Sequence, residues 1–128
     1  MTGGIGGIGG IGGRIATGSV YQPPNEPYPR VLVMRRWPRG VAKRAVDQWE
    51  PDLGPSNALL SAYQDGEVPW DAFAERYRAE VLERPNLLDW VARMAAGTGV
   101  TLLCGSHPDE ECHRSLLAAI LRERLGQS

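Results

Sequence analysis

Lysine is almost absent from this sequence, cysteine and histidine occur only twice each, and no long hydrophobic run is present. Two cysteines are too few for the disulfide-rich class of small secreted domains. No segment approaches the roughly 18 apolar residues of a membrane span, and no signal-peptide pattern opens the chain. The 14 basic and 15 acidic residues give a net charge of −1, which provides no overall attraction to nucleic acid or anionic lipid. We therefore expect a cytoplasmic protein that does not associate with a membrane.

What the sequence does contain is one domain's length of chain behind a glycine-rich start. Its 128 residues fall within the commonest size of a single domain. Residues 3–13 repeat Gly-Gly-Ile, which forms neither helix nor strand readily because glycine loses so much backbone freedom on folding. The repeat also fits G-x-G-x-x-G, but that motif signifies a nucleotide site only between a strand and a helix. We predict a flexible tail over residues 1–13 and an ordered domain over 14–128.

The hydrophobic pattern of the rest predicts an α/β fold: a single small layered domain with a short, mostly parallel sheet flanked by helices. Strands are predicted over residues 14–21, 30–35 and 100–104. Helices are predicted from a cap at Ser56, from 69–71 to 84, over 87–96, and up to Leu125. Four aromatic residues at helical spacing are expected in the core: Trp70, Phe73, Tyr77 and Trp90.

Several short motifs resemble a known bacterial family. They are R-R-W-P-R-G at 35–40, Pro55-Ser56, W-x-x-F-x-x-x-Y from Trp70, Cys104, and Cys-His-Arg at 112–114. Together they are similar to the DUF488 proteins (domain of unknown function 488), and the resemblance spans residues 14–125. It implies an α/β fold and an uncharacterised activity, without supplying a reaction. The chain departs from the family pattern at Met34, where an Asp is usual, and at Leu60, where an Arg is frequent.

The segment 104–114 follows a predicted buried strand and leads into the last helix. Ligands of α/β proteins bind outside the carboxyl ends of strands, and helix N-termini favour anions. Arg35, Arg36 or Arg39 can approach from the end of the other confident strand. The candidate ligand-binding residues are Trp37, Arg39, Ser56, His113 and Arg114. The alternative is that Arg114 only pairs with Glu110 or Glu111.

The two cysteines admit several interpretations. A cysteine-phosphatase loop needs an arginine six residues after Cys104, where Glu110 stands instead. Cys112 can be a catalytic thiol with His113 as its base, although three acidic neighbours at 109–111 disfavour a thiolate. A Cys104–Cys112 redox pair and two inert buried thiols are the other interpretations.

Zinc is a further possibility for this segment. Four residues offer zinc-type ligands: Cys104, His107, Cys112 and His113. Adjacent residues such as Cys112 and His113 diverge on a helix, whereas closed zinc sites use pairs spaced by two to four residues. We therefore expect no metal and no cofactor.

We expect the protein to bind a small anionic molecule or nucleotide at the strand-end site, and the sequence leaves open whether it is also an enzyme. The alternatives are a thiol-dependent enzyme using Cys112, a scaffold protein without chemistry, and a nucleic-acid-associated module using Arg35, Arg36, Trp37 and Arg39. A net charge of −1 argues against nucleic acid as the partner. The anion hypothesis requires residues 37–40 and 112–114 to lie at the same edge of the sheet.

Overall fold

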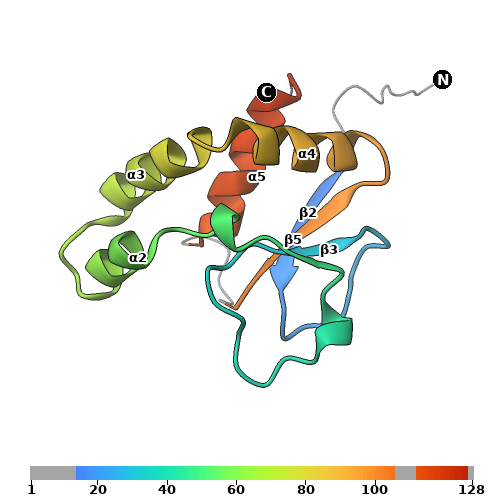
Figure 1. The fold of residues 1–128 in the computed structure, drawn as a ribbon, viewed down its shortest axis with the longest axis horizontal. Coiled ribbons are helices and arrows are strands. Elements are labelled where there is room, and N and C mark those ends of the chain that lie inside the picture. Colours follow the sequence, from blue (N-terminus) through green and yellow to red (C-terminus); the bar gives the residue numbers. More distant parts are fainter. Residues whose placement is uncertain (1–13, 106–111, 127–128) are drawn as a thin grey trace.

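The computed structural model describes residues 14–105 and 112–126 (Figure 1). Within these residues it is an α/β domain with one sheet and a set of covering helices. The proposed tail at 1–13 and the acidic stretch at 109–111 lie outside the described residues. No helix in the described part of the chain is long and apolar enough to span a membrane.

Among the described residues, four parallel strands form the sheet in the order β2-β5-β3-β4. They are β2 (Ile15–Ser19), β5 (Val100–Cys104), β3 (Arg30–Leu32) and β4 (Gln48–Trp49). β5 is buried along its whole length because strands pair with both of its edges. The predicted strand at 30–35 is shorter than expected, although the Val33 amide still donates to the Leu103 carbonyl oxygen at 2.9 Å. β4 was not predicted, because two residues carry no periodicity.

The helices begin where local sequence signals place them. They are α2 (Asn57–Gln64), α3 (Trp70–Leu82), α4 (Pro85–Ala96) and α5 (His113–Arg124), with short 3-10 turns at Lys43–Ala45 and Pro51–Leu53. Ser56 caps α2 by accepting a hydrogen bond from the Leu59 amide, and Pro85 occupies the first turn of α4. α5 starts at His113, so Cys112 is its N-cap residue and does not lie beyond its first turn.

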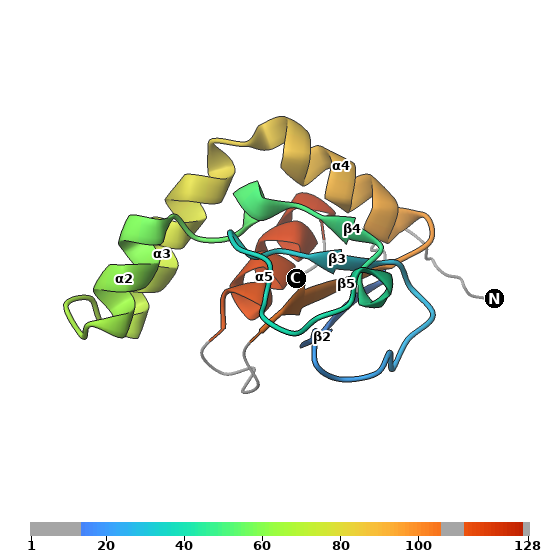
Figure 2. The ribbon, with the colours of Figure 1, turned by 60° about the horizontal axis from the view of Figure 1, so that its bottom comes forward.

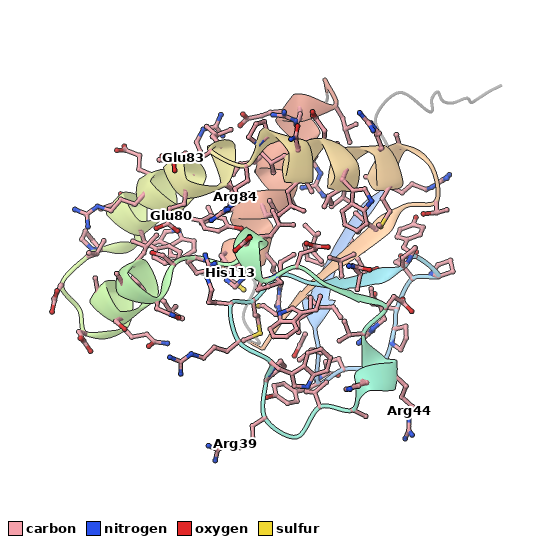
Figure 3. All side chains as sticks on the ribbon, viewed as in Figure 1. Arg39, Arg44, Glu80, Glu83, Arg84 and His113 are labelled. Carbon is pink, nitrogen blue, oxygen red and sulfur yellow. The ribbon has the colours of Figure 1, made fainter. Side chains whose placement is uncertain are left out.

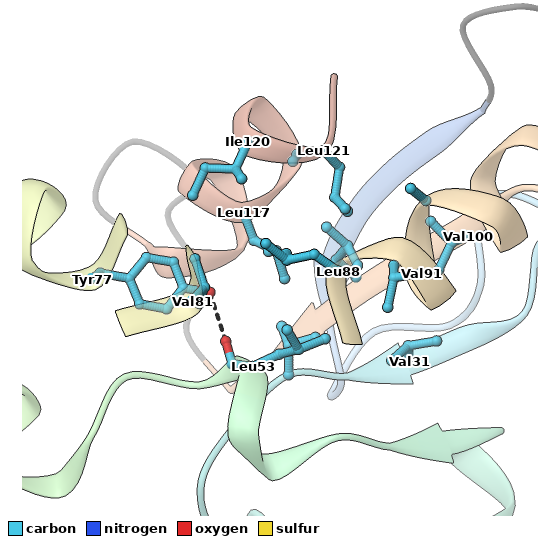
Figure 4. Close-up of a cluster of buried hydrophobic side chains, with 14 of the residues drawn as sticks. Val31, Leu53, Tyr77, Val81, Leu88, Val91, Val100, Leu117, Ile120 and Leu121 are labelled. Carbon is cyan, nitrogen blue, oxygen red and sulfur yellow. Dashed lines mark hydrogen bonds between the residues drawn. The ribbon is translucent and has the colours of Figure 1, made fainter. Parts of the chain in front are cut away.

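One face of the sheet packs against α3, α4 and α5 (Figure 4). Val31, Val100 and Leu102 project from the strands into this core and meet Leu88 and Leu117 from the helices. The remaining buried members are large aliphatic and aromatic side chains, including Leu53, Phe73, Tyr77, Val81, Val91, Ile120 and Leu121. Trp90 was expected in this core, but it lies on the outer side of α4 and is 38% exposed.

The other face of the sheet is covered by irregular segments (Figure 2). Leu32 and Leu103 form a small cluster there with Val20. Partly buried side chains from the chain after β3 pack against it: Met34, Trp37, Val41 and Val46. The sheet therefore has a helix-covered face and a loop-covered face, and the two faces offer different sites.

Candidate functional site

Three side chains with metal-ligand and nucleophilic chemistry meet where β5 ends and α5 begins. One ligand atom from each of Cys104, Cys112 and His113 lies within 4.8 Å of the other two. These are three of the four zinc candidates in the sequence, and the fourth, His107, lies outside the described residues. The buried end of β5 and the N-cap of α5 bring the two thiols together.

The two sulfur atoms and a buried arginine form the centre of this cluster. Cys104 Sγ and Cys112 Sγ are 2.6 Å apart, and the Arg114 Nη1 atom lies 3.1 Å from Cys104 Sγ. Arg114 is 1% exposed and also donates to the Gly18 carbonyl oxygen at 2.9 Å. The hydrogen bond to Cys104, followed by burial, raises the pKa of the Cys112 thiol, although the Arg114 amide and guanidinium oppose this rise. Cys112 is therefore a protonated thiol near neutral pH.

His113 connects α5 to the end of β3. Its Nε2 atom lies 2.5 Å from the Val33 carbonyl oxygen, and its ring meets the Tyr77 ring edge-on at 5.6 Å. Burial lowers the pKa of His113 to about 4, with a contribution from the Arg114 charge, even though the Val33 bond acts in the opposite direction. A carbonyl only accepts, so the neutral imidazole carries its proton on Nε2 and donates to Val33. This bond places the start of α5 next to the exit of β3.

Several of the family-like motif residues hold the fold together around this centre. The Tyr77 hydroxyl donates to the Leu53 carbonyl oxygen at 2.6 Å and is fully buried (Figure 4). The Glu80 carboxylate accepts from the Ser56 amide at 2.8 Å and from the Ser56 hydroxyl at 2.6 Å. Ser56, a predicted ligand residue, is thus engaged in capping α2 and joining it to α3.

A cleft of about 270 Å³ opens between the exit of β3 and α2. His113 forms part of its wall, and other lining residues include Arg35, Arg36, Pro55 and Gln64. Met34 and Leu60, the two positions that depart from the family pattern, both line this cleft. At these two positions, where the family resemblance implies a usual Asp and a frequent Arg, this chain presents a thioether and an isobutyl group.

A larger cleft of about 580 Å³ lies on the loop-covered face, and we call it the Arg30 cleft. Arg30, Thr101 and Arg114 line it, together with Thr17, Gly18, Ser19, Leu103 and the loop residues Gln22, Pro23, Pro24 and Asn25. Arg30 and Thr101 are register partners on β3 and β5, so their side chains stand side by side on one face. Both are buried, at 8% and 3% exposure.

The five predicted ligand residues are distributed over different parts of the domain. His113 lines the β3–α2 cleft, Arg114 lines the Arg30 cleft, and Trp37 lines a separate hollow beside Trp49. Trp37 donates to the Val41 carbonyl oxygen at 2.9 Å. Arg39 is exposed and extends outward, away from His113 (Figure 3). His113, Arg114 and Trp37 thus each line a different cleft. A single site shared by all five residues stays a prediction.

Sequence reasoning did not identify Arg30 and Thr101 as residues that line a cleft. Arg30 was interpreted only as the first residue of a strand, and Thr101 as one polar residue in an apolar run. The available signal was a polar residue within each of two strands expected to be fully buried. Only the register of β3 against β5 shows that these two polar residues are neighbours.

Comparison with known proteins supports the family resemblance. The chain is 34% identical over 95 residues to the uncharacterized protein YeaO of Escherichia coli, covering 73% of this chain and 83% of that protein. It is 31% identical over 97 residues to the uncharacterized proteins Mb3100c of Mycobacterium bovis and Rv3073c of Mycobacterium tuberculosis, covering 74% of this chain and 81% of each. No solved structure gives a significant match.

The family model described as the active DUF488-N3 subclade, DUF488-N3a, matches residues 15–125. That range includes every strand and helix of the described residues. The chain therefore belongs to the DUF488 family, in its DUF488-N3a subclade.

Proposed function

We propose that the protein binds a small anionic molecule, such as a phosphate-bearing nucleotide, in the Arg30 cleft. The observation that carries the proposal is the Thr101 hydroxyl, a buried polar group without a hydrogen-bond partner among the described residues. Its neighbour on the same face is a buried guanidinium. A hydroxyl donor beside a cation is the arrangement that a phosphate or carboxylate oxygen accepts from.

Arg30 has donor capacity left for a ligand. Its Nε atom donates to the Ala45 carbonyl oxygen at 2.9 Å and its Nη2 atom to the Gln22 carbonyl oxygen at 3.1 Å. A guanidinium has five N–H groups, so these two bonds leave three. Asp47 bonds to the Arg30 backbone amide at 2.7 Å, but no carboxylate in residues 14–105 or 112–126 forms an ion pair with the Arg30 guanidinium. A buried cation without a counter-charge is unfavourable, and a bound anion would relieve that cost.

The rest of the cleft suits a ligand larger than a single ion. Its volume of about 580 Å³ falls in the usual range for small-molecule sites. Arg114 adds a second buried positive charge to the lining, and Gly18 leaves part of the floor without a side chain. Asn25 and Gln22 offer amide groups from the loop above. These features favour a phosphate or carboxylate attached to a polar organic group.

A nucleophilic role for Cys112 is less well supported. The residue is 3% exposed and lines none of the three clefts, and the raised pKa of its thiol leaves little thiolate at neutral pH. Binding of an anion is therefore the function we propose, with no reaction attached to it.

Thermal-shift and calorimetric titrations of the full chain with inorganic phosphate and with AMP test the proposal. Thr101→Val removes the unpartnered hydroxyl while keeping the side-chain shape, and Arg30→Gln removes the charge. We expect Thr101→Val to weaken AMP or phosphate binding about 10-fold or more, the range for a hydrogen bond to a charged group. Arg39→Gln is the matched control because Arg39 is exposed and points away from the domain.

Two results would contradict the proposal. One is the absence of any phosphate or AMP binding at millimolar concentration. The other is binding that Thr101→Val leaves unchanged and Arg39→Gln weakens, which would move the anion to the exposed loop. A single-stranded oligonucleotide in the same titrations tests the nucleic-acid alternative, since binding there would depend on Arg39 and its exposed neighbours.

A further inference from the structure

We propose that Cys104 and Cys112 are a redox-active pair that closes into a reversible disulfide between the end of β5 and the N-cap of α5. The inference does not require anion binding in the Arg30 cleft, although Arg114 lines that cleft and also contacts Cys104. It assigns a covalent modification to two thiols that are not joined by a disulfide in this structure.

The sulfur atoms are already close to bonding distance. Their separation of 2.6 Å is well inside the roughly 3.5–4.0 Å at which even the smaller carbon atoms pack without a bond. A disulfide needs about 2.05 Å, so the sulfurs have to approach by only about 0.6 Å. Both cysteines sit on fixed elements, one in the central strand and one at the first residue before a helix.

The same spacing fits zinc poorly. Two thiolates on a tetrahedral zinc ion, each at about 2.3 Å from the metal, are separated by about 3.8 Å. The Nε2 atom of His113 is bonded to the Val33 carbonyl oxygen, which leaves only its Nδ1 atom as a possible metal ligand. The distance between the two sulfur atoms is therefore closer to that of a disulfide than to that of two zinc ligands.

Arg114 determines which sulfur reacts first. Its guanidinium lies 3.1 Å from Cys104 Sγ, so a negative charge on the pair is best placed on Cys104, with Cys112 keeping the proton. The raised pKa of Cys112, caused chiefly by its hydrogen bond to Cys104, agrees with this division. Cys104 is then the attacking thiolate and Cys112 the resolving thiol.

A low-molecular-weight disulfide such as oxidised glutathione is the oxidant. The Cys104 thiolate attacks one glutathione sulfur, the glutathione S–S bond breaks, and the released glutathione thiolate takes up a proton. Cys112 then loses its proton and attacks Cys104 Sγ, which displaces the second glutathione. Two protein thiols and one oxidised glutathione thus yield one protein disulfide and two reduced glutathiones. Because both sulfurs are buried, we expect equilibration to take hours.

The test equilibrates the full chain in glutathione buffers of graded ratio, quenches it with acid, and alkylates it with N-ethylmaleimide in denaturant. Intact mass then reports the state of each thiol. We expect a reduced form with two adducts to convert in one step into an unlabelled form about 2 Da lighter than the reduced chain. Reduction with dithiothreitol should restore both adducts.

Cys104→Ser and Cys112→Ser are the matched controls, because each leaves one thiol that can only form a stable glutathione adduct. The proposal is overturned if the wild-type chain accumulates one glutathione per molecule, or if both thiols still react with N-ethylmaleimide at the most oxidising ratio. It is also overturned if the purified protein carries one equivalent of zinc that protects both thiols until a chelator removes it. Anion binding is measured separately, so its failure would not alter these masses.

Discussion

Acidification between pH 7 and pH 4 should destabilise the domain through His113. The folded protein holds the pKa of this imidazole at about 4, whereas a histidine in the unfolded chain titrates near 6.5. Between these values the unfolded state binds the extra proton, so the free energy of unfolding falls as the pH falls. Above about pH 6.5 the contribution of His113 is fully present, and it is lost by about pH 4.

The size of the effect follows from the pKa difference. Each unit corresponds to about 1.36 kcal/mol, so a difference of about 2.5 units gives a loss of up to about 3 kcal/mol. Such a loss is a large fraction of the stability of a small domain. Its structural origin is the burial of the ring between Tyr77 and Val33.

Urea denaturation from pH 7.5 to pH 4, compared between wild type and His113→Gln, isolates this contribution. Glutamine retains an N–H donor for the Val33 carbonyl but does not titrate, so the difference in unfolding free energy between the two proteins should shrink steadily below pH 6.5. His107→Gln is the control for the other histidine. Parallel pH curves for wild type and His113→Gln, or a slope that only His107→Gln removes, would refute the reasoning.

The remaining predictions concern stability. Thr101→Val should raise the unfolding free energy by about 1 kcal/mol, seen as a melting temperature higher by about 4 °C, because it removes an unpartnered buried hydroxyl; a loss of similar size would show that the hydroxyl is bonded. Ser56→Ala should cost about 1–2 kcal/mol in urea denaturation, since it removes the cap of α2 and a partner of Glu80; an unchanged midpoint would contradict this role. Tyr77→Phe should lower the free energy of unfolding by about 1–3 kcal/mol, because it leaves the buried Leu53 carbonyl without its donor. The measurement is urea denaturation, in which an unchanged slope shows that only stability has changed and an unchanged midpoint would contradict the prediction. Deletion of residues 1–13 should leave the melting temperature within a few degrees, and a collapse would show that the tail packs on the domain.

Local sequence signals correctly predicted most of the secondary structure. Ser56 starts α2 because its side chain accepts a hydrogen bond from a free amide of the first turn. Pro85 starts α4 because proline has no amide N–H that would need a partner there. The apolar run at 100–104 is a strand buried on both faces. β4 was not predicted because two residues are too few to show the alternating pattern of a strand. Trp90 was wrongly assigned to the core because helical spacing alone does not define which side chains of a helix face solvent.

The candidate sites were less predictable than the elements that carry them. The motif 112–114 was singled out from the sequence, and the structure places His113 against Val33, just beyond the end of β3. The prediction that Arg114 serves one common site with Arg39 and Trp37 remains untested, since these residues line different surfaces of the domain.

By itself the sequence determined where the chain turns helical or extended, and which residues can carry chemistry, because capping, proline geometry and hydrophobic period act over a few neighbouring positions. The tertiary structure alone decided which of these residues meet. Strand register places Arg30 beside Thr101, and the packing of α5 brings His113 to Val33, 80 residues away in the chain. Such contacts depend on the order of strands in the sheet and on the docking of helices, and the burial of many side chains together fixes both.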